Sequence, residues 1–67
     1  MIEIELNGAL HRVPAQQTLH ELIEALQLGG QALALAVNRS VVPRQRWAGH
    51  TLAAHDKVDI VRAIGGG

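Results

Sequence analysis

The N-terminal part of the chain predicts a β-hairpin followed directly by an amphipathic helix, and this order restricts the fold more than any other feature. Asn7-Gly8 favours a tight hairpin turn because both residues accept positive φ. A strand that returns antiparallel is expected over residues 9–13 and ends at Pro14. The strand before the turn shows a period of two, with glutamates on one face and aliphatic side chains on the other, namely Ile2, Ile4 and Leu6.

The helix is predicted from its start signal and from its apolar stripe. Thr18 is a good N-cap residue, and Glu21 stands three residues later, which completes a capping box. Gly29-Gly30 is expected to end the helix, since glycine takes the left-handed conformation at C′ with little strain. Apolar side chains recur along one face at helical spacing, namely Leu19, Leu22, Ile23 and Leu26.

Three more strands are predicted after the helix. Residues 33–37 alternate large aliphatic side chains with alanines, and a turn over residues 38–40 leads to a short edge strand that Pro43 limits. Residues 44–56 are expected to be irregular, with Trp47 and Leu52 as core anchors, and a last strand is expected over residues 57–64. We favour a core position for Trp47 over a binding hot spot.

The resulting order is β-β-α-β-β-β, in which one helix covers one face of a mixed sheet. Sixty-seven residues make a single domain, and this order predicts an α+β fold of the ubiquitin-like β-grasp type over residues 1–64. Residues 65–67 are expected to form a flexible glycine tail. The fold alone says little about function.

Composition excludes several classes of function. The chain has no cysteine, which excludes disulfides and a thiol nucleophile of its own, and six basic residues balance six acidic ones, which makes nucleic acid an unexpected partner. No segment resembles a signal peptide or a membrane span, so the cytoplasm is the expected compartment. The four histidines lack the spacing of a metal site, and neither a metal nor a cofactor is expected. Ser40, His55 and Asp56 do not form a catalytic triad, because adjacent residues point apart on a strand.

The chain stops on Gly65-Gly66-Gly67, directly after the last predicted strand. Such an end is expected to form a thin arm with a carboxylate at its tip, although chain ends are also commonly frayed.

The sequence resembles the ThiS family, bacterial sulfur carriers for the thiazole half of thiamin, over almost the whole chain. The Gly-Gly end of the chain is shared with ubiquitin and with the small subunit of molybdopterin synthase. This end therefore indicates the class of ubiquitin-like proteins but not the particular family within it. His55 stands where the family usually has glycine, and Gly65 stands where another small or polar residue is commoner. The matching segments are Asn7-Gly8, Thr18 to Leu22, Leu35 to Asn38, Val41 to Arg44 with Trp47, and Val58 to Gly67.

The resemblance implies a co-substrate and not an enzyme. The carboxylate of Gly67 would be adenylated and then converted to a thiocarboxylate, and Gly66 would allow its passage into a closed nucleotide site. The implied partners are a ThiF-like adenylating enzyme, the thiazole synthase ThiG and a persulfide sulfur donor. Because the chain lacks cysteine, the sulfur must come from a partner.

A partner must also bind the body of the domain. Val58 and Ile60 are expected to face the helix, whereas Val61 has the opposite parity and should lie beside alanines on the solvent face. An exposed apolar patch near a reactive tail indicates a docking surface, although single exposed aliphatic side chains are common. Arg44 either meets an acidic patch of a partner or is a solvated loop residue. The residues expected to bind partners are Val61, Ile64, Gly65 and Arg44.

Three other functions remain open at this point. The chain could supply sulfur for molybdopterin or another product, but those relatives approach the Gly-Gly end through an aromatic residue and a proline, which are absent here. It could be a ubiquitin-like modifier that forms isopeptide bonds to lysines. It could also be a β-grasp interaction module whose tail has no chemical role.

Overall fold

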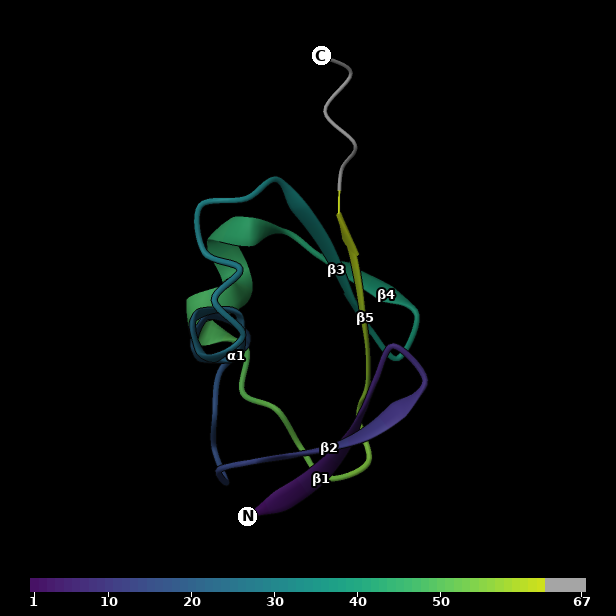
Figure 1. Cartoon of the computed structure of the whole chain (residues 1–67). Helices are drawn as coiled ribbons and strands as arrows, with labels where there is room; N and C mark the ends of the chain where they lie inside the picture. Colours follow the sequence, from purple (N-terminus) through teal and green to yellow (C-terminus); the bar gives the residue numbers. More distant parts are fainter. Residues whose placement is uncertain (63–67) are drawn as a thin grey trace.

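The strands and the α-helix follow one another in the predicted order in the computed structural model, which describes residues 1–62 (Figure 1). The last strand is observed to Arg62, and residues 63 and 64 of its predicted range lie outside the described residues. The elements are β1 (Ile2–Leu6), β2 (Ala9–Val13), α1 (Leu19–Ala25), β3 (Leu33–Val37), β4 (Ser40–Val42), the 3₁₀-helix η1 (Arg44–Gly49) and β5 (Lys57–Arg62).

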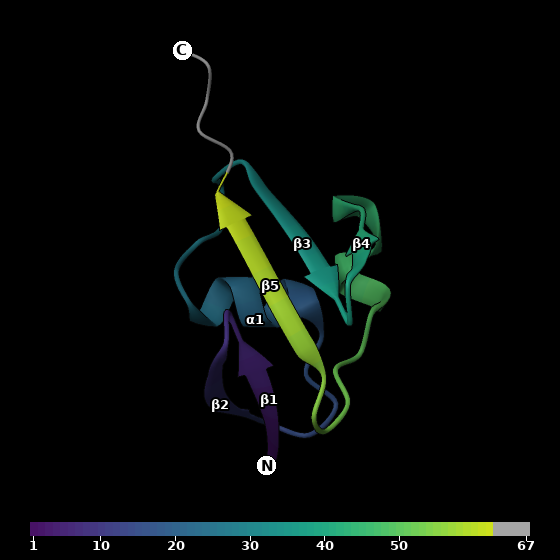
Figure 2. The ribbon, with the colours of Figure 1, turned by 90° about the vertical axis from the view of Figure 1, so that its right-hand side faces the viewer.

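The five strands form one mixed sheet in the order β2-β1-β5-β3-β4. The last strand, β5, is therefore the central strand, parallel to β1 on one side and antiparallel to β3 on the other (Figure 2). This arrangement, with the helices on one face, confirms the predicted α+β β-grasp fold. The N-terminus of the chain and the C-terminal end of β5 lie at opposite ends of the molecule (Figure 1).

Both hairpins turn through two residues with positive φ. The predicted turn at Asn7-Gly8 is confirmed, with φ values of 49° and 84°. The second turn uses Asn38 and Arg39, with φ values of 51° and 70°, and Ser40 already belongs to β4. Positive φ at both central positions is the backbone geometry of a type I′ turn, whose twist matches that of the flanking strands.

The helix begins as the sequence predicts. The Thr18 hydroxyl accepts a hydrogen bond from the Glu21 amide at 3.2 Å, and the Glu21 carboxylate accepts one from the Thr18 amide at 2.9 Å. Both halves of the capping box are thus present, and two backbone N–H groups that lack helical partners are satisfied.

The predicted end of the helix is wrong. The residue in the left-handed conformation at C′ is Gln27, with φ 60°, and not a glycine of the Gly29-Gly30 pair. The Gln27 amide donates to the Glu24 carbonyl and the Leu28 amide donates to the Ile23 carbonyl, each at 3.0 Å, which is the hydrogen-bond pattern of a Schellman motif. Leu28 is partly buried and packs against the core, so the early turn brings this side chain onto the core.

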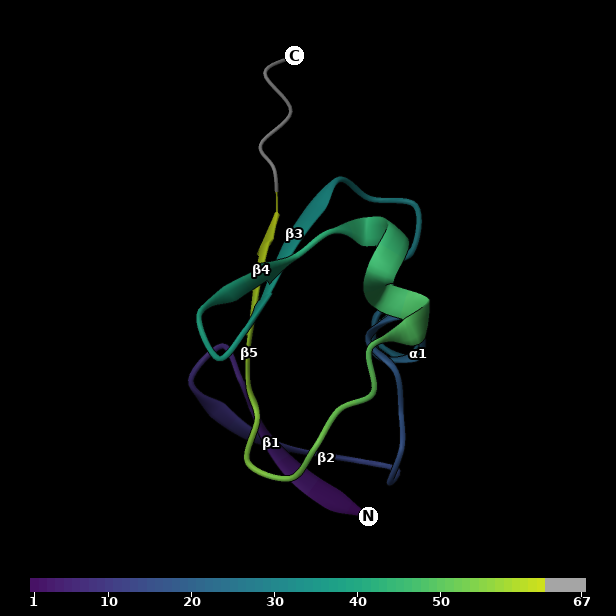
Figure 3. The ribbon, with the colours of Figure 1, turned by 180° about the vertical axis from the view of Figure 1, so that it is seen from behind.

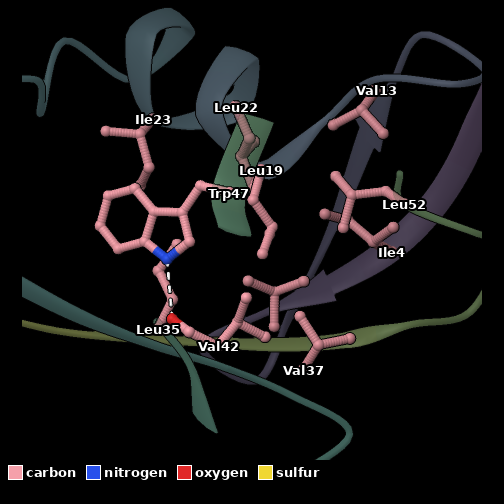
Figure 4. Close-up of a cluster of buried hydrophobic side chains, with 11 residues drawn as sticks. Ile4, Val13, Leu19, Leu22, Ile23, Leu35, Val37, Val42, Trp47 and Leu52 are labelled. Carbon is pink, nitrogen blue, oxygen red and sulfur yellow. Dashed lines mark hydrogen bonds between the residues drawn. The ribbon is translucent and has the colours of Figure 1, made fainter. Parts of the chain in front are cut away.

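The core lies between the sheet and the layer made by α1 and η1 (Figures 1 and 3). Trp47 and Leu52 are 2% and 3% exposed, which confirms them as core anchors. The indole of Trp47 lies beside Ile23 and donates to the Val42 carbonyl at 2.8 Å (Figure 4). The sequence did not predict that Arg44–Gly49 form a 3₁₀-helix; this turn places the indole over the end of β4.

Candidate functional site

The residues predicted to react follow β5 in the sequence. Ile64, Gly65, Gly66 and Gly67 lie outside the described residues. The described part of the candidate site is therefore the C-terminal half of β5 and the surfaces on either side of it.

The inner side of β5 anchors the strand in the core. Val58 is fully buried, and Ile60 is partly buried and packs against the core cluster. Both residues face the helix layer, as predicted from their parity. The strand that precedes the predicted tail is therefore anchored to the core by its inner side chains.

The outer side of β5 contributes to an exposed apolar patch. Val61 is 62% exposed, and its register partner on β3 is the exposed Ala34. The next outward pair on β3 and β4 is Ala36 and Val41, of which Val41 is 76% exposed. Val41 was not predicted as part of this surface, because its pairing with Ala36 depends on the turn between the strands. We call Ala34, Ala36, Val41 and Val61 the outer apolar patch.

The rest of the outer face is mainly charged. On β1 and β2 the side chains of Glu3 and Arg12 lie opposite each other, with Arg12 Nε 3.4 Å from a Glu3 carboxylate oxygen. Leu10, which is 78% exposed, also lies on this half of the face. Asp59 pairs with Ala36 and so borders the outer apolar patch. The charged side chains of this face on β1, β2 and β5 are Glu3, Glu5, Arg12, Lys57 and Asp59.

Two asparagines, one from each hairpin turn, contact the backbone of β5. The Asn7 amide donates to the Val58 carbonyl at 2.9 Å, and its side-chain Oδ1 accepts from the Ile60 amide at 2.8 Å. On the other side, the Asn38 amide donates to the Lys57 carbonyl at 2.7 Å, and its Oδ1 accepts from the Lys57 amide at 3.0 Å. Sequence reasoning assigned both asparagines to turns and missed these contacts.

The loop before β5 is held by Asp56. One carboxylate oxygen accepts from the Asn38 side-chain amide at 3.1 Å, and the other accepts from the Ala53 amide at 2.8 Å. His55 has φ 71°, a left-handed conformation that favours glycine, and its amide donates to the Glu3 carbonyl at 2.7 Å. These contacts explain Asp56 as a structural residue of the loop.

Arg44 lies apart from the outer apolar patch. It is the first residue of η1, in the layer on the opposite side of the sheet (Figure 3). Its guanidinium donates to the Gln31 carbonyl at 2.6 Å and lies 4.7 Å from the centroid of the Trp47 ring, a cation–π contact. The structure therefore does not bring Arg44 together with Val61, and a contact between Arg44 and a partner stays a prediction.

Within residues 1–62, no group of three or more histidine, aspartate or glutamate side chains is arranged to hold a metal ion. No helix in the same part of the chain is long and apolar enough to cross a membrane.

A family model and a relative that is covered in full identify the same family. The model of the ThiS family matches residues 3–67. The sulfur carrier protein ThiS of Escherichia coli (strain K12) is 36% identical over 66 residues, which cover 98% of this chain and 100% of that protein. A thiazole synthase of Magnetococcus marinus is 33% identical over 66 residues, but these make up only 20% of that protein.

Solved structures show the same fold. The crystal structure of a thiamine biosynthesis protein (ThiS) from Geobacter metallireducens superposes with a TM-score of 0.85, covers 98% of this chain and 100% of that chain, and is 23% identical. An NMR structure of a thiamine biosynthesis protein from the same organism gives a TM-score of 0.79, with 98% and 88% coverage and 23% identity.

Proposed function

The chain belongs to the ThiS family, and from this premise we propose that it is a sulfur carrier protein for thiazole formation in thiamin biosynthesis, a co-substrate and not an enzyme. The observation that supports this most directly is the extent of the similarity. The family match reaches Gly67, and the alignment with the E. coli sulfur carrier covers that protein completely.

The proposed chemistry takes place at the carboxylate of Gly67. A carboxylate is a poor electrophile, because it is anionic and resonance-stabilised. Attack of this carboxylate on ATP gives an acyl adenylate and releases pyrophosphate. A persulfide then displaces AMP, and a second thiol cleaves the sulfur–sulfur bond to leave a thiocarboxylate. The chain has no cysteine, so both sulfur groups belong to partners.

The glycine tail suits this reaction. Gly65 and Gly66 have no side chains, which permits close approach of the backbone to the walls of a nucleotide site. Activation requires ATP, and we therefore place the protein in the cytoplasm.

We propose three partners. The adenylating step requires a ThiF-like enzyme, and the sulfur requires a persulfide donor. The thiocarboxylate is then a soft nucleophile for the thiazole synthase ThiG. The similarity between this chain and a fifth of a thiazole synthase supports the proposal that carrier and synthase act together.

The outer apolar patch is our proposed docking surface for the adenylating enzyme. It lies on β5, β3 and β4, beside the last described residue before the tail, and it is bordered by the charged Asp59. An apolar centre with a polar rim is the usual composition of a protein interface. Val61 is its most prominent side chain on β5; Ile64 and Gly65 would follow it into the partner, and Arg44 would make a separate contact from the other layer.

The intact mass of the chain tests the proposal. The chain is incubated with ATP, the adenylating enzyme and a cysteine-desulfurase sulfur source, and its mass is measured before and after. We expect a shift equal to one oxygen exchanged for one sulfur, and no shift in a variant that lacks Gly67.

A control carrier treated in parallel shows that the enzymes are active. No shift in this chain, when the control carrier is converted, would contradict the sulfur-carrier function. Conjugates to lysines on a gel would instead identify a ubiquitin-like modifier.

A further inference from the structure

We propose that Asn7 is a positioning residue for the reactive end of the chain, because its side chain fixes β5 at the last point where the strand is held from both sides. This inference rests on the proposed function, since it assigns Asn7 a role in presenting Gly67 to the adenylating enzyme.

The Asn7 side chain supplies the hydrogen-bond acceptor that β1 would offer to β5 if β1 continued beyond Leu6. The parallel pairing of β1 with β5 has the register Glu5 with Lys57 and Leu6 with Val58, and the Asn7 amide continues it by donating to the Val58 carbonyl. The backbone then turns away with positive φ at Asn7 and Gly8. Its side-chain Oδ1 accepts from the Ile60 amide at 2.8 Å, where the next acceptor of a parallel ladder would stand.

Because of this contact, β5 is hydrogen-bonded on both of its edges as far as Ile60, two residues closer to the tail than Val58. Beyond Ile60, the pairings of Val61 and Arg62 within residues 1–62 are with β3 alone. Without the Asn7 acceptor, the last residue held from both sides would be Val58. Two residues of extended chain span about 7 Å. Misplacement of a reacting group by about 1 Å is enough to slow a reaction that depends on alignment.

Asn38 provides a matched comparison. It occupies the same position in the other hairpin turn, with similar φ, and it also accepts a hydrogen bond from a β5 amide through Oδ1. Its partner is Lys57, the first residue of β5, at the opposite end of the strand from Arg62. The Asn38 side-chain amide also donates to Asp56, so Asn38→Gly removes at least as much stabilising contact as Asn7→Gly. If Asn7 acts through the position of the tail, only the Asn7 substitution should lower the rate of activation.

The test uses substitutions that keep each turn. Asn7→Gly accepts the positive φ of the turn and removes the side-chain acceptor for Ile60, whereas Asn7→Asp restores an acceptor oxygen. Adenylation of each full-length variant is followed by pyrophosphate exchange at varied carrier concentration, at a temperature where circular dichroism shows every variant fully folded.

We expect Asn7→Gly to lower kcat roughly five-fold, the factor that one ordinary hydrogen bond corresponds to, with KM little changed because the outer apolar patch is intact. Asn7→Asp should recover kcat to within about two-fold. Asn38→Gly should lower the unfolding midpoint and leave kcat at the level of the unsubstituted chain. Hydrogen exchange measured by NMR should show a faster-exchanging Ile60 amide in Asn7→Gly only.

Each contrary result overturns the inference. An unchanged kcat in Asn7→Gly, or an unchanged Ile60 exchange rate, would show that Asn7 does not hold the strand for activation. An equal loss of kcat in Asn38→Gly would show a general effect of lost stability. Absence of pyrophosphate exchange with the unsubstituted chain would instead reject the proposed function, and this inference with it.

Discussion

The two faces of the sheet use the same residue types for different purposes. Val58 and Val61 both lie on β5, three residues apart, yet Val58 is 0% exposed and Val61 is 62% exposed. On the inner face, large side chains meet α1 and η1, whereas on the outer face alanines and two exposed valines lie beside charged residues. Parity along a single strand thus separates the side chains that fold the domain from those available to a partner.

The energetics of burial make this separation quantitative. Full burial of a valine contributes about 1.5–3 kcal/mol relative to leaving it exposed. Val58 receives this contribution and Val61 receives little of it, since its cross-strand partner is only an alanine. We infer that the inner face determines stability and that the outer face determines recognition, which can be tested by substitutions on each face.

The largest expected effect is in the core that the inner face helps to form, at Trp47 of η1. Trp47→Ala should lower the free energy of unfolding by about 3–5 kcal/mol, because it empties a site that is only 2% exposed and leaves the Val42 carbonyl without its donor. Urea unfolding followed by circular dichroism measures this loss. Trp47→Phe keeps an aromatic ring and should lose less. A loss below about 1 kcal/mol in Trp47→Ala would show that the indole is not a core residue.

The next expected effects compare Val58 with Val61 directly. Val58→Ala should lower the free energy of unfolding by about 2 kcal/mol and leave the KM of the carrier for adenylation unchanged in the folded protein. Val61→Asp should do the opposite, raising KM about ten-fold while stability changes by less than about 0.5 kcal/mol, because it places a charge in the centre of the proposed interface. Unchanged activation kinetics in Val61→Asp would reject the outer apolar patch as the docking surface.

The sequence predicted what depends on neighbouring residues. The Asn7-Gly8 turn, the Thr18 cap and the alternation of β1 follow from contacts within a few positions, and the structure confirms them. The hydrogen bond from the Ile60 amide to Asn7 joins residues 53 positions apart, and no periodicity in the sequence indicates which strands become neighbours. The 3₁₀-helix was missed for a related reason, since burial of Trp47 against the core favours it.

The smallest expected effect concerns the helix end, where the sequence prediction failed. Gln27 holds a left-handed φ of 60° at an exposed site, and this conformation costs a non-glycine residue about 1–2 kcal/mol. Gln27→Gly removes this strain but gives the unfolded chain more freedom, which costs about 0.4–1 kcal/mol. The difference should raise the free energy of unfolding by about 0.5 kcal/mol.

Gln27→Ala is the matched control, because it retains a Cβ in the strained conformation and should give no gain. Gln27→Gly should also leave the KM and kcat of adenylation unchanged, because Gln27 follows α1 and lies away from the outer apolar patch. A change in either constant would show that the end of α1 takes part in recognition. Loss of stability in Gln27→Gly would show that the left-handed turn costs the native chain less than the added freedom of the unfolded one.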